Sequence, residues 1–457
     1  MHRDTPLAPF SDLAHPGRLA LTGAVLVLLL AGFVPLARAQ AYLRWDQAAR
    51  PAALGGAAAG LAEDPSAVFY NPAGIVHLFG TYFQAGGNLA VDEARFRAFG
   101  GDGAFGGDGA SERDESPILA GSLYATHTVA QQLTAGLGVN APWGLSVDWG
   151  NPTAFAGRFR SIESRLSAIQ FNPVLAYGPV GPWSGAIGVD VLYATLGLER
   201  FEQDPAVSAL GGRSPIALAR THLEADGTGV GWNAALMYRP SARIAAGAQY
   251  RSEIDIELSG VADFEIVAPA DLRQIVVPGR EITVGELIAD RFVDQSVLST
   301  VTFPHLAVVG VAVRPLEQLR LALDVQWVGW GAVDSLALAF TDSALDEAGP
   351  LLYEDAWAIR GGVEFEVRPG LPLRLGYAWL ETPTPALAVT PLLPDAGRDV
   401  YSVGAGLGWF GNRVDLGYRV TILDDREGVA FPGDPGALDG IYEAVLHEIG
   451  ISVSRRL

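Results

Sequence analysis

Residues Arg243 to Leu258 read RIAAGAQYRSEIDIEL, and this stretch decides the fold class. Its even-numbered positions, beginning at Ile244, are almost all apolar, whereas its odd-numbered positions hold its charged side chains. Because successive side chains of a strand point to opposite faces, the pattern predicts one strand of about sixteen residues with an apolar and a charged face. Soluble strands usually have about five or six residues. A transmembrane barrel strand needs this combination, with one face toward lipid and one toward a wet lumen.

Further segments carry the same alternation of apolar and charged positions. They run from Leu319 to Trp327, from Trp357 to Arg368 and from Arg413 to Ile422, and the C-terminal HEIGISVSRRL suits a closing strand. A soluble β-sandwich also alternates, so alternation alone does not establish a membrane barrel. The strand length and the charge content of the second face favour the barrel. We therefore predict an all-β fold, a transmembrane antiparallel β-barrel.

Aromatic residues near the predicted strand ends fit the girdles that barrels place at the two membrane interfaces. Each of them could instead pack in a core. The residues are Trp143, Trp149, Tyr250 and Trp327.

The N-terminus has the features of an export signal. Arg3 and Arg18 precede an apolar run that ends at Leu36, and Ala37-Arg38-Ala39 follows as an A-x-A cleavage site. We therefore predict a signal peptide over residues 1–39, cleaved near Ala39. The alternative is an uncleaved anchor, because a run of about eighteen mostly apolar residues lies near the lower limit for a helical span.

Composition excludes several kinds of chemistry. The formal net charge is −20, and it becomes −21 without residues 1–39, so nucleic acid is not an expected partner. All 31 basic residues are Arg, which removes any lysine-dependent phosphate site or Schiff base. The chain has no Cys, so it contains no disulfide and no thiolate metal site. Its 55 Gly and 29 Pro punctuate many strands.

The pattern changes once along the mature chain. Residues 40–79 are rich in Ala and Gly without strand alternation and predict a small, partly helical domain, whereas 80–457 alternate and predict the barrel. Long polar connections should be extracellular, because such barrels keep their periplasmic turns short. We expect these connections at 100–116, 202–216, 261–300, 341–355, 381–398 and 424–442.

No motif for catalysis or metal binding is present. The seven histidines are scattered, with no Ser/His/Asp spacing, G-x-S-x-G elbow or H-E-x-x-H sequence, so we do not expect an enzyme. The segment GDGAFGGDGASERDE, residues 101–115, alternates Gly with carboxylates but lacks the spacing of a calcium loop and is interpreted as a solvated loop. We predict no metal and no cofactor.

Four blocks, in order, resemble the FadL family of outer-membrane transporters for long-chain fatty acids and other hydrophobic compounds. They are LAEDPSAVFYNPAG (Leu61–Gly74), a block from Asn140 to Phe201, one from Asp226 to Gly260, and one that begins at Thr302. The resemblance implies a barrel of 14 strands plugged by an N-terminal hatch, in the outer membrane of a Gram-negative bacterium. It also puts Arg251, Glu253, Asp255 and Glu257 on the barrel wall, where we expect a lumenal ion-pair network.

The resemblance also implies functional residues. Asn71, Pro72 and Ala73 match the hatch signature and are expected to form a gate, in which Asn71 bonds the barrel wall or the ligand's polar end. The alternative is a local turn, which Asn and Pro favour. Gly144 matches the glycine at the kinked third strand of the family, although the nearby Pro142 also breaks a ladder and could move the kink.

Arg200 matches an arginine near the internal ligand site of the family, where a guanidinium could neutralise a carboxylate. The alternative is an ion pair with Glu199 or Glu202.

The expected function is passive transport of a hydrophobic small molecule, a fatty acid or a hydrocarbon. Extracellular loops would capture the ligand, an internal pocket would hold it, and hatch movement would release it sideways at the kinked strand into outer-membrane lipid. Barrel assembly machinery would be a partner during biogenesis. An open porin for polar solutes is an alternative that the hatch disfavours, and a barrel hydrolase is a weaker one.

Overall fold

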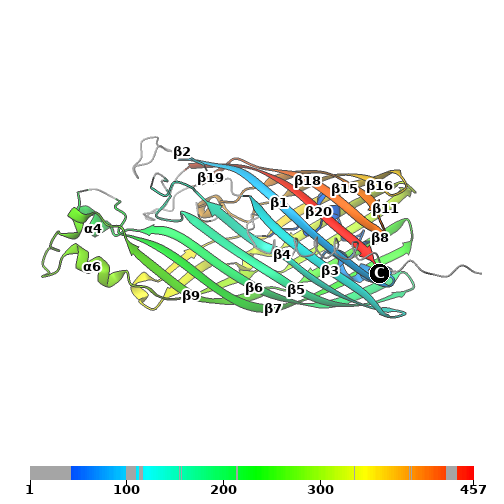
Figure 1. The fold of residues 1–457 in the computed structure, drawn as a ribbon, viewed down its shortest axis with the longest axis horizontal. Helices are drawn as coiled ribbons and strands as arrows, with labels where there is room; N and C mark the ends of the chain where they lie inside the picture. The colour runs from blue at the N-terminus through cyan, green and yellow to red at the C-terminus, as the bar shows by residue number, and fades with distance from the viewer. Residues whose placement is uncertain are drawn as a thin grey trace, which may run out of the picture.

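The computed structural model describes residues 43–98, 110–112, 117–153, 155, 157–212, 215–333, 335–390, 392, 394–428 and 440–457. The predicted signal peptide and its cleavage site lie outside these residues. One antiparallel sheet closes on itself, because β1 (Thr81–Ala98) pairs with β3 (Ile118–Ala130) on one side and with β20 (Gly440–Arg456) on the other. The result is a closed barrel of 14 wall strands, which confirms the predicted fold class (Figure 1).

Several wall strands are interrupted and therefore carry two labels. After β1, the wall is formed in chain order by β2 (Ala110–Glu112) with β3, β4 (Leu133–Asp148), β5 (Glu163–Val180), β6 (Trp183–Glu202), β7 (Ala219–Ser241), β8 (Ile244–Arg251) with β9 (Ile254–Ile266), β10 (Gln295–Phe303) with β11 (Leu306–Leu316), β12 (Leu319–Val328) with β13 (Ser335–Phe340), β14 (Glu347–Pro350) with β15 (Ala356–Arg368), β16 (Leu371–Leu380), β17 (Arg398–Trp409), β18 (Asn412–Leu423) with β19 (Arg426–Gly428), and β20.

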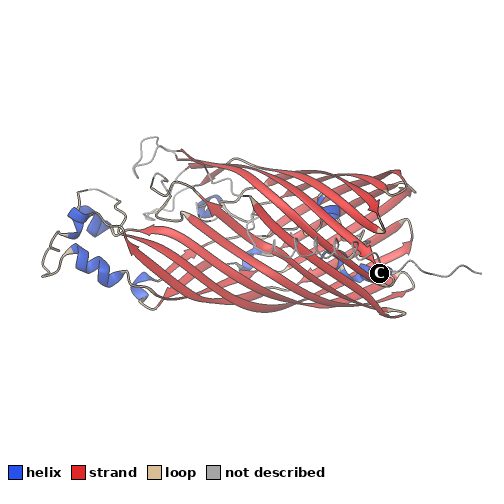
Figure 2. Cartoon of the chain, in the orientation of Figure 1, coloured by secondary structure: helices blue, strands red, loops and turns tan. Residues whose placement is uncertain are grey.

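The two ends of the barrel differ. Turns of two residues join neighbouring strands at the end that holds the C-terminus, as between β7 and β8 (Figure 1). The opposite end carries the long connections and the helices α4 (Pro205–Leu210), α5 (Ala270–Arg273) and α6 (Val284–Arg291) (Figure 2). This asymmetry agrees with the expected division into long and short connections. The connection predicted at 261–300 is shorter, 267–294, and the one at 149–162 was not predicted.

The outward face of the wall is apolar. Leu321, Leu323 and Val325 on β12 are all exposed, and their neighbours of opposite parity, such as Asp324, are buried toward the lumen. The predicted alternation of this segment is therefore correct. Among the described residues, no helix is long and apolar enough to cross a membrane.

Two of the aromatic residues expected at the membrane interfaces are inside the barrel instead. Trp143 and Trp149 are buried, and Trp149 stacks on Phe155 with ring centroids 4.8 Å apart. For these two residues the alternative, core packing, is correct. Tyr250 and Trp327 do lie on the outward side, where both rings pack against His305.

The stretch Arg243–Leu258 is not one strand, as predicted, but the end of a turn, β8 and the start of β9. Asn233 of β7 pairs with Arg251, whereas Asp226 pairs with Ser259, so β8 and β9 together hold one residue more than β7 between these pairs. One extra residue in a strand reverses the face to which every later side chain points.

The reversal changes the environment of the charged row. Ile254, Ile256 and Leu258 are buried in the lumen, whereas Asp255 and Glu257 are exposed on the outer face. Arg251 precedes the reversal and is lumenal, with Nη1 2.6 Å from Asp190 Oδ1. The expected lumenal network of Arg251, Glu253, Asp255 and Glu257 is therefore wrong, because period-two alternation was carried through a register shift that the sequence does not reveal.

The described N-terminal segment, residues 43–79, occupies the lumen. It contains the short helices α2 (Ala49–Ala52) and α3 (Ala67–Tyr70) and the 3-10 helix η1 (Pro72–His77). Side chains from distant strands bind its backbone: Ser452 Oγ accepts from Ala49 N at 2.9 Å, and Asp324 Oδ2 accepts from Ala58 N and Ala59 N, both at 2.8 Å. The segment is thus held by several sides of the wall at once.

Inward-facing glycines let this segment approach the wall. A Cβ on Gly376 of β16 would lie 2.1 Å from Gly55 N, and a Cβ on Gly247 of β8 would lie 2.0 Å from Ala59 O. Any side chain at these two positions would collide with the backbone of the segment. The composition suggested that the glycines separate strands. Some of them instead lie within wall strands and make room for the N-terminal segment.

We expect Gly376→Val to displace the N-terminal segment and destabilise the protein by about 1–3 kcal/mol, since overpacking against backbone cannot be relieved by a rotamer change. Its thermal unfolding midpoint should fall, and residues near Gly55 should become cleavable by protease. The matched control is Gly408→Val on β17, where a Cβ would meet nothing within 4 Å. Equal behaviour of the two variants would contradict the close-packing argument.

Candidate functional site

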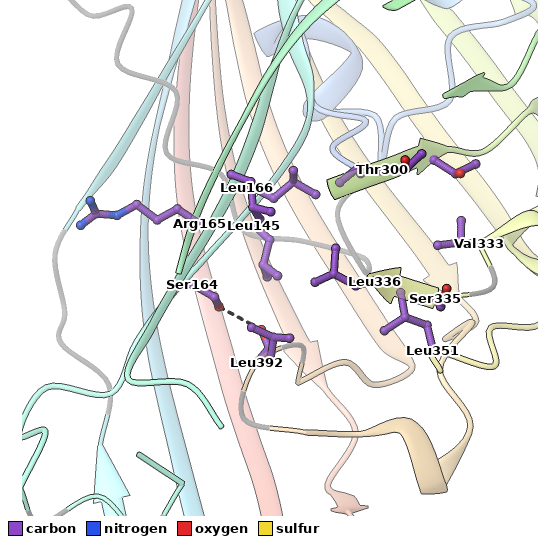
Figure 3. Close-up of a pocket in the computed structure, with 13 residues that line it drawn as sticks. Leu145, Ser164, Arg165, Leu166, Thr300, Val333, Ser335, Leu336, Leu351 and Leu392 are labelled. Carbon is purple, nitrogen blue, oxygen red and sulfur yellow. Dashed lines mark hydrogen bonds between the residues drawn. The ribbon is translucent and has the colours of Figure 1, made fainter. Parts of the chain in front are cut away.

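An apolar cavity lies inside the barrel toward the end with the long connections (Figure 3). It has about 490 Å³ of empty space, part of it open to solvent. Ser164 Oγ donates to Leu392 O at 2.9 Å, so that hydroxyl is satisfied, and Arg165 points away from the cavity in Figure 3. A concave site lined mainly by aliphatic side chains, with few polar groups, suits an apolar ligand. Its aliphatic lining comprises Leu145, Leu166, Leu196, Val301, Val333, Leu336, Leu351 and Leu392.

The strand β4, which carries Leu145, is irregular directly before the cavity. Its pairing with β3 ends at Val139, and its register with β5 shifts by one residue between Asn140 and Trp143. From Asn140 to Val147 the strand is buried on both faces, whereas β5 alternates between buried and exposed positions. Beyond Val139, β4 therefore no longer pairs with β3, although it stays paired with β5 as far as Asp148.

The shift lies beside one of the two residues considered for the kink. Ala141 and Pro142 together oppose a single residue of β5, and Pro142 has no N–H to donate to a ladder. Gly144 lies beyond the shift and pairs regularly with Ser167. The irregularity is therefore at Pro142 rather than at Gly144.

The N-terminal segment supplies partners for the backbone of β4 at this irregularity. Arg44 N donates to Pro142 O at 2.6 Å. The Gln47 amide donates to Ala141 O and accepts from Ala141 N, both at 3.2 Å. Leu43 forms a β-bridge with Trp143. Backbone groups that have left the β3 ladder are thus satisfied by residues 43–47, as buried polar groups require.

The structure places Asn71, Pro72 and Ala73 on η1 and against the wall. Asn71 is completely buried, and its Oδ1 accepts from Ala73 N at 3.1 Å, which caps η1. Its Nδ2 donates to Ala59 O at 2.8 Å and to Leu236 O of β7 at 3.2 Å. Ala73 O accepts from Ser184 Oγ of β6 at 2.8 Å. This signature therefore forms a local turn and also contacts two wall strands.

Arg200 does not line the apolar cavity. Its Nε lies 2.9 Å from Glu202 Oε1, and its Nη1 contacts Glu347 on β14. The pairing with Glu202 is the alternative considered above, whereas Glu199 pairs with Arg220 at 2.5 Å. A ligand carboxylate at Arg200 would have to compete with two carboxylates that already hold its guanidinium.

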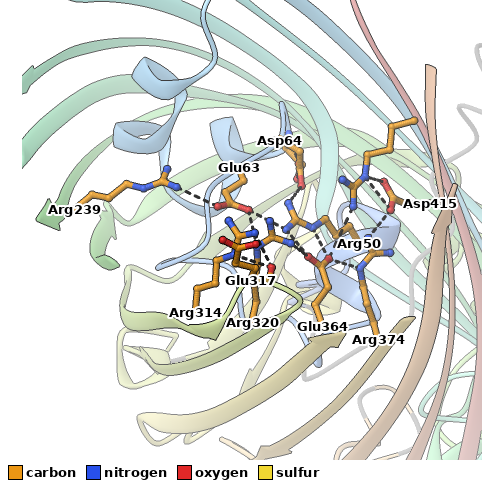
Figure 4. Close-up of polar contacts among 12 residues, drawn as sticks. Arg50, Glu63, Asp64, Arg239, Arg314, Glu317, Arg320, Glu364, Arg374 and Asp415 are labelled. Carbon is orange, nitrogen blue, oxygen red and sulfur yellow. Dashed lines mark hydrogen bonds and ion pairs between the residues drawn. The ribbon is translucent and has the colours of Figure 1, made fainter. Parts of the chain in front are cut away.

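A further cluster, which the sequence did not reveal, joins the N-terminal segment to the wall nearer the C-terminal end (Figure 4). Glu364 of β15 binds Arg50 at 3.1 Å, Arg320 at 2.6 Å and Arg374 at 2.7 Å. Glu63 also binds Arg50, at 3.2 Å. Burial would raise the pKa of Glu63, but Arg50 and Arg320 hold it below its usual value. Alternation predicted that Glu364 is lumenal, but not that Arg50 would be its partner.

A family model supplies the identification. The model of outer-membrane protein transport proteins of the OMPP1/FadL/TodX type matches residues 30–434. The chain belongs to this family. The resemblance seen in the sequence is thereby confirmed, and the family is one of outer-membrane transport proteins and not of enzymes.

Relatives of this chain include a protein named for fatty acid transport and a protein named only as an outer membrane protein. A long-chain fatty acid transport protein of Salmonella typhi is 25% identical over 291 residues, which cover 60% of this chain and 63% of that protein. The alignment thus spans less than two thirds of that relative. Outer membrane protein P1 of Haemophilus influenzae is 25% identical over 395 residues, covering 79% of this chain and 81% of that protein.

Solved structures of FadL-family members have the same fold. A Pseudomonas aeruginosa FadL homologue superposes with a TM-score of 0.78 at 18% identity, covering 91% of this chain and 99% of that one. The Pseudomonas putida toluene transporter TodX gives 0.69 at 17% identity, covering 90% and 98%. At these identities the likeness establishes the fold alone.

We expect Asn71→Ala to destabilise the docked N-terminal segment by about 1–3 kcal/mol, because the carbonyls of Ala59 and Leu236 lose a buried donor. Thermal unfolding and hydrogen exchange of residues 58–74 would measure the loss. The control is Asn412→Ala, at a turn, where the amide donates to Trp409 O at 3.2 Å and we expect a change within about 0.5 kcal/mol. A loss no larger than that of the control would mean that Asn71 does not hold the segment to the wall.

Proposed function

We propose that this FadL-family protein passively transports long-chain fatty acids or other hydrophobic compounds across the outer membrane, with release to the side of the barrel at Pro142. The observation that carries the proposal is the position of Leu145. This residue lines the apolar cavity and lies three residues beyond Pro142, in the part of β4 that no longer pairs with β3. A ligand in the cavity therefore needs to travel only a short distance to reach the gap in the wall.

Capture is proposed for the end with the long connections. The connections 203–218 and 267–294 pack on each other around Val207, Leu272, Ile288 and Phe292. Exposed apolar side chains such as Val276 and Val293 lie on the same elements. An apolar solute can gather on such a surface before it enters the barrel, because its transfer from water is favourable there.

Release is proposed to require movement of residues 43–47. These residues satisfy the backbone of Ala141 and Pro142, and Leu43 bridges Trp143. As long as they stay in place, the inner side of the gap is closed. Asn71, Pro72 and Ala73 are proposed to act as the anchor about which the segment moves, since they bond to β6 and β7. The released ligand would enter outer-membrane lipid.

The cavity and the relatives support an apolar ligand. The cavity is aliphatic, which suits a hydrocarbon chain or an aromatic hydrocarbon equally. One relative is named a long-chain fatty acid transport protein, and one structural neighbour is named a monoaromatic hydrocarbon channel. An open porin is disfavoured by the N-terminal segment, because it contacts opposite sides of the wall. Insertion would rely on barrel assembly machinery.

Movement of the N-terminal segment can be tested by a disulfide, since the chain has no native Cys. Leu43 and Trp143 are partners in a β-bridge, and Cα atoms in such a bridge lie within about 4.4–6.8 Å, the range that a disulfide needs. We expect the double variant Leu43→Cys/Trp143→Cys to take up labelled fatty acid when reduced and to lose most uptake when oxidised. The single variants, treated with the same oxidant, are the controls. Full uptake by the oxidised double variant would refute the proposed movement.

Release at the gap can be tested by deleting Pro142. The deletion removes the extra residue of β4 and so allows continuous pairing with β5, while Leu145 still faces the cavity. We expect uptake to fall at least about tenfold, with heat-modifiable migration on gels to verify folding. Gly144→Trp, which fills the gap without a deletion, is the second variant. Normal uptake by both folded variants would exclude release at this place.

A further inference from the structure

We propose a second internal binding site, centred on Arg360, that takes the carboxylate group of an anionic ligand. The site is a cavity between residues 43–46 of the N-terminal segment and the wall strands β15 to β18 and β20. It shares no lining residue with the apolar cavity. That a fatty acid reaches this site rests on the proposed function. The preference of the site for a carboxylate is argued from the side chains that line the cavity.

The cavity is rich in guanidinium groups. Arg398 pairs with Asp395, Arg419 pairs with Glu448 at 2.5 Å, and Arg44 pairs with Asp46 at 3.1 Å. These three pairs balance their charges. The fourth arginine of the lining, Arg360, forms no ion pair with a carboxylate of the lining, and the acidic side chain opposite it, Asp324 of β12, does not line the cavity.

Arg360 is buried without a hydrogen-bond partner. Its residue is 2% exposed, and neither Nη1 nor Nη2 makes a hydrogen bond to any described residue. Its guanidinium lies over the ring of Trp45, with 5.3 Å between Cζ and the ring centroid, which leaves the edge of the fork free. A buried charge without a partner is costly, so this arrangement points to a ligand that satisfies it.

The wall does not supply that partner directly. Asp324 of β12 faces Arg360 across the ladder, but its Oδ2 already accepts from Ala58 N and Ala59 N. No described carboxylate lies within 4.0 Å of the Arg360 nitrogens as an ion pair. A water bridge between Arg360 and the Oδ1 of Asp324 is the competing explanation, and it makes a different prediction for stability.

A monocarboxylate is the ligand that fits. The planar fork of a guanidinium binds a carboxylate through two parallel hydrogen bonds, which would satisfy both Nη1 and Nη2 of Arg360. Leu43, Leu380 and Val400 also line the cavity and can cover the first methylenes of an attached chain. A fatty acid and a free short carboxylate share this head-group chemistry.

The test compares binding of hexadecanoate, hexadecanol and acetate to the full protein in detergent. We expect the wild type to bind hexadecanoate at least about tenfold more tightly than hexadecanol, because charge-assisted hydrogen bonds are strong in a buried site. Arg360→Met should remove this preference and leave hexadecanol binding unchanged, and Arg360→Lys should keep part of it. Arg243→Met, at an exposed turn, is the matched control and should behave like the wild type. An unchanged preference in Arg360→Met would overturn the proposal.

Competition and stability complete the test. Acetate that competes with hexadecanoate in the wild type, and not in Arg360→Met, would identify a site for free carboxylates; no competition would identify one for the amphiphile. Without ligand, Arg360→Met should raise the unfolding midpoint, since it removes an unpaired buried charge. A lowered midpoint would favour the water bridge and overturn the proposal. If the wild-type protein does not take up fatty acid, the proposed transport is refuted. The preference for hexadecanoate over hexadecanol tests the Arg360 site independently of transport.

Discussion

The pairing register of the wall strands is the constraint on which the rest of this structure depends. Side chains of a strand alternate between lipid and lumen, so a single extra residue exchanges the two faces from that point onward. The barrel contains such shifts at Pro142 of β4 and between β8 and β9. The neighbouring wall strand, β10 with β11, keeps a constant register with β9 and β8. Its lipid-facing and lumen-facing positions are therefore exchanged at the same level.

These exchanges build the apolar cavity. Without the shift in β4, Gly144 and Ser146 would face the lumen in place of Leu145 and Val147. Without the shift after Arg251, Asp255 and Glu257 would face inward. The lumen is therefore lined by charged side chains around the N-terminal segment and by aliphatic ones toward the long connections. Each strand still alternates between apolar and polar residues on both sides of the shift. The same shift in β4 releases backbone groups, which must be satisfied in the absence of water and are bound by residues 43–47.

The N-terminal segment thus has two physical roles that oppose each other. Its contacts with wall glycines, with Asp324 and with the Glu364 cluster hold it firmly in the lumen. Its contacts with β4 are hydrogen bonds to one irregular strand, which can be exchanged without breaking the closed wall. The two internal cavities differ in their relation to this segment: the apolar one is lined by other parts of the chain, such as Leu145 of β4, whereas the arginine-rich one is lined in part by residues 43–46. A ligand that contacts the segment could therefore bias its position.

Most of the fold followed from the sequence, because alternation is a local property. The lipid-facing parity of Leu319–Trp327 and Trp357–Arg368 was predicted correctly, as were the long connections at one end. The N-terminal segment that carries Asn71 contains short helices, and its role as a hatch stays a prediction. The candidate site followed less well. The kink was expected at Gly144 or at Pro142, and the register shift lies at Pro142. Arg200 was expected to bind a ligand or to pair with Glu199 or Glu202, and it is held by Glu202 and by Glu347, which lies 147 residues away in the chain.

The sequence by itself determined that this protein is a membrane barrel of the FadL family, since the period of its strands and four ordered motifs are written in neighbouring residues. Only the tertiary structure decided which residues face the ligand. The direction in which a side chain points depends on how many residues a strand holds relative to its neighbour. The partner of each buried charge depends on which distant segments the closure of the barrel brings together. Neither quantity is encoded within a single stretch of chain.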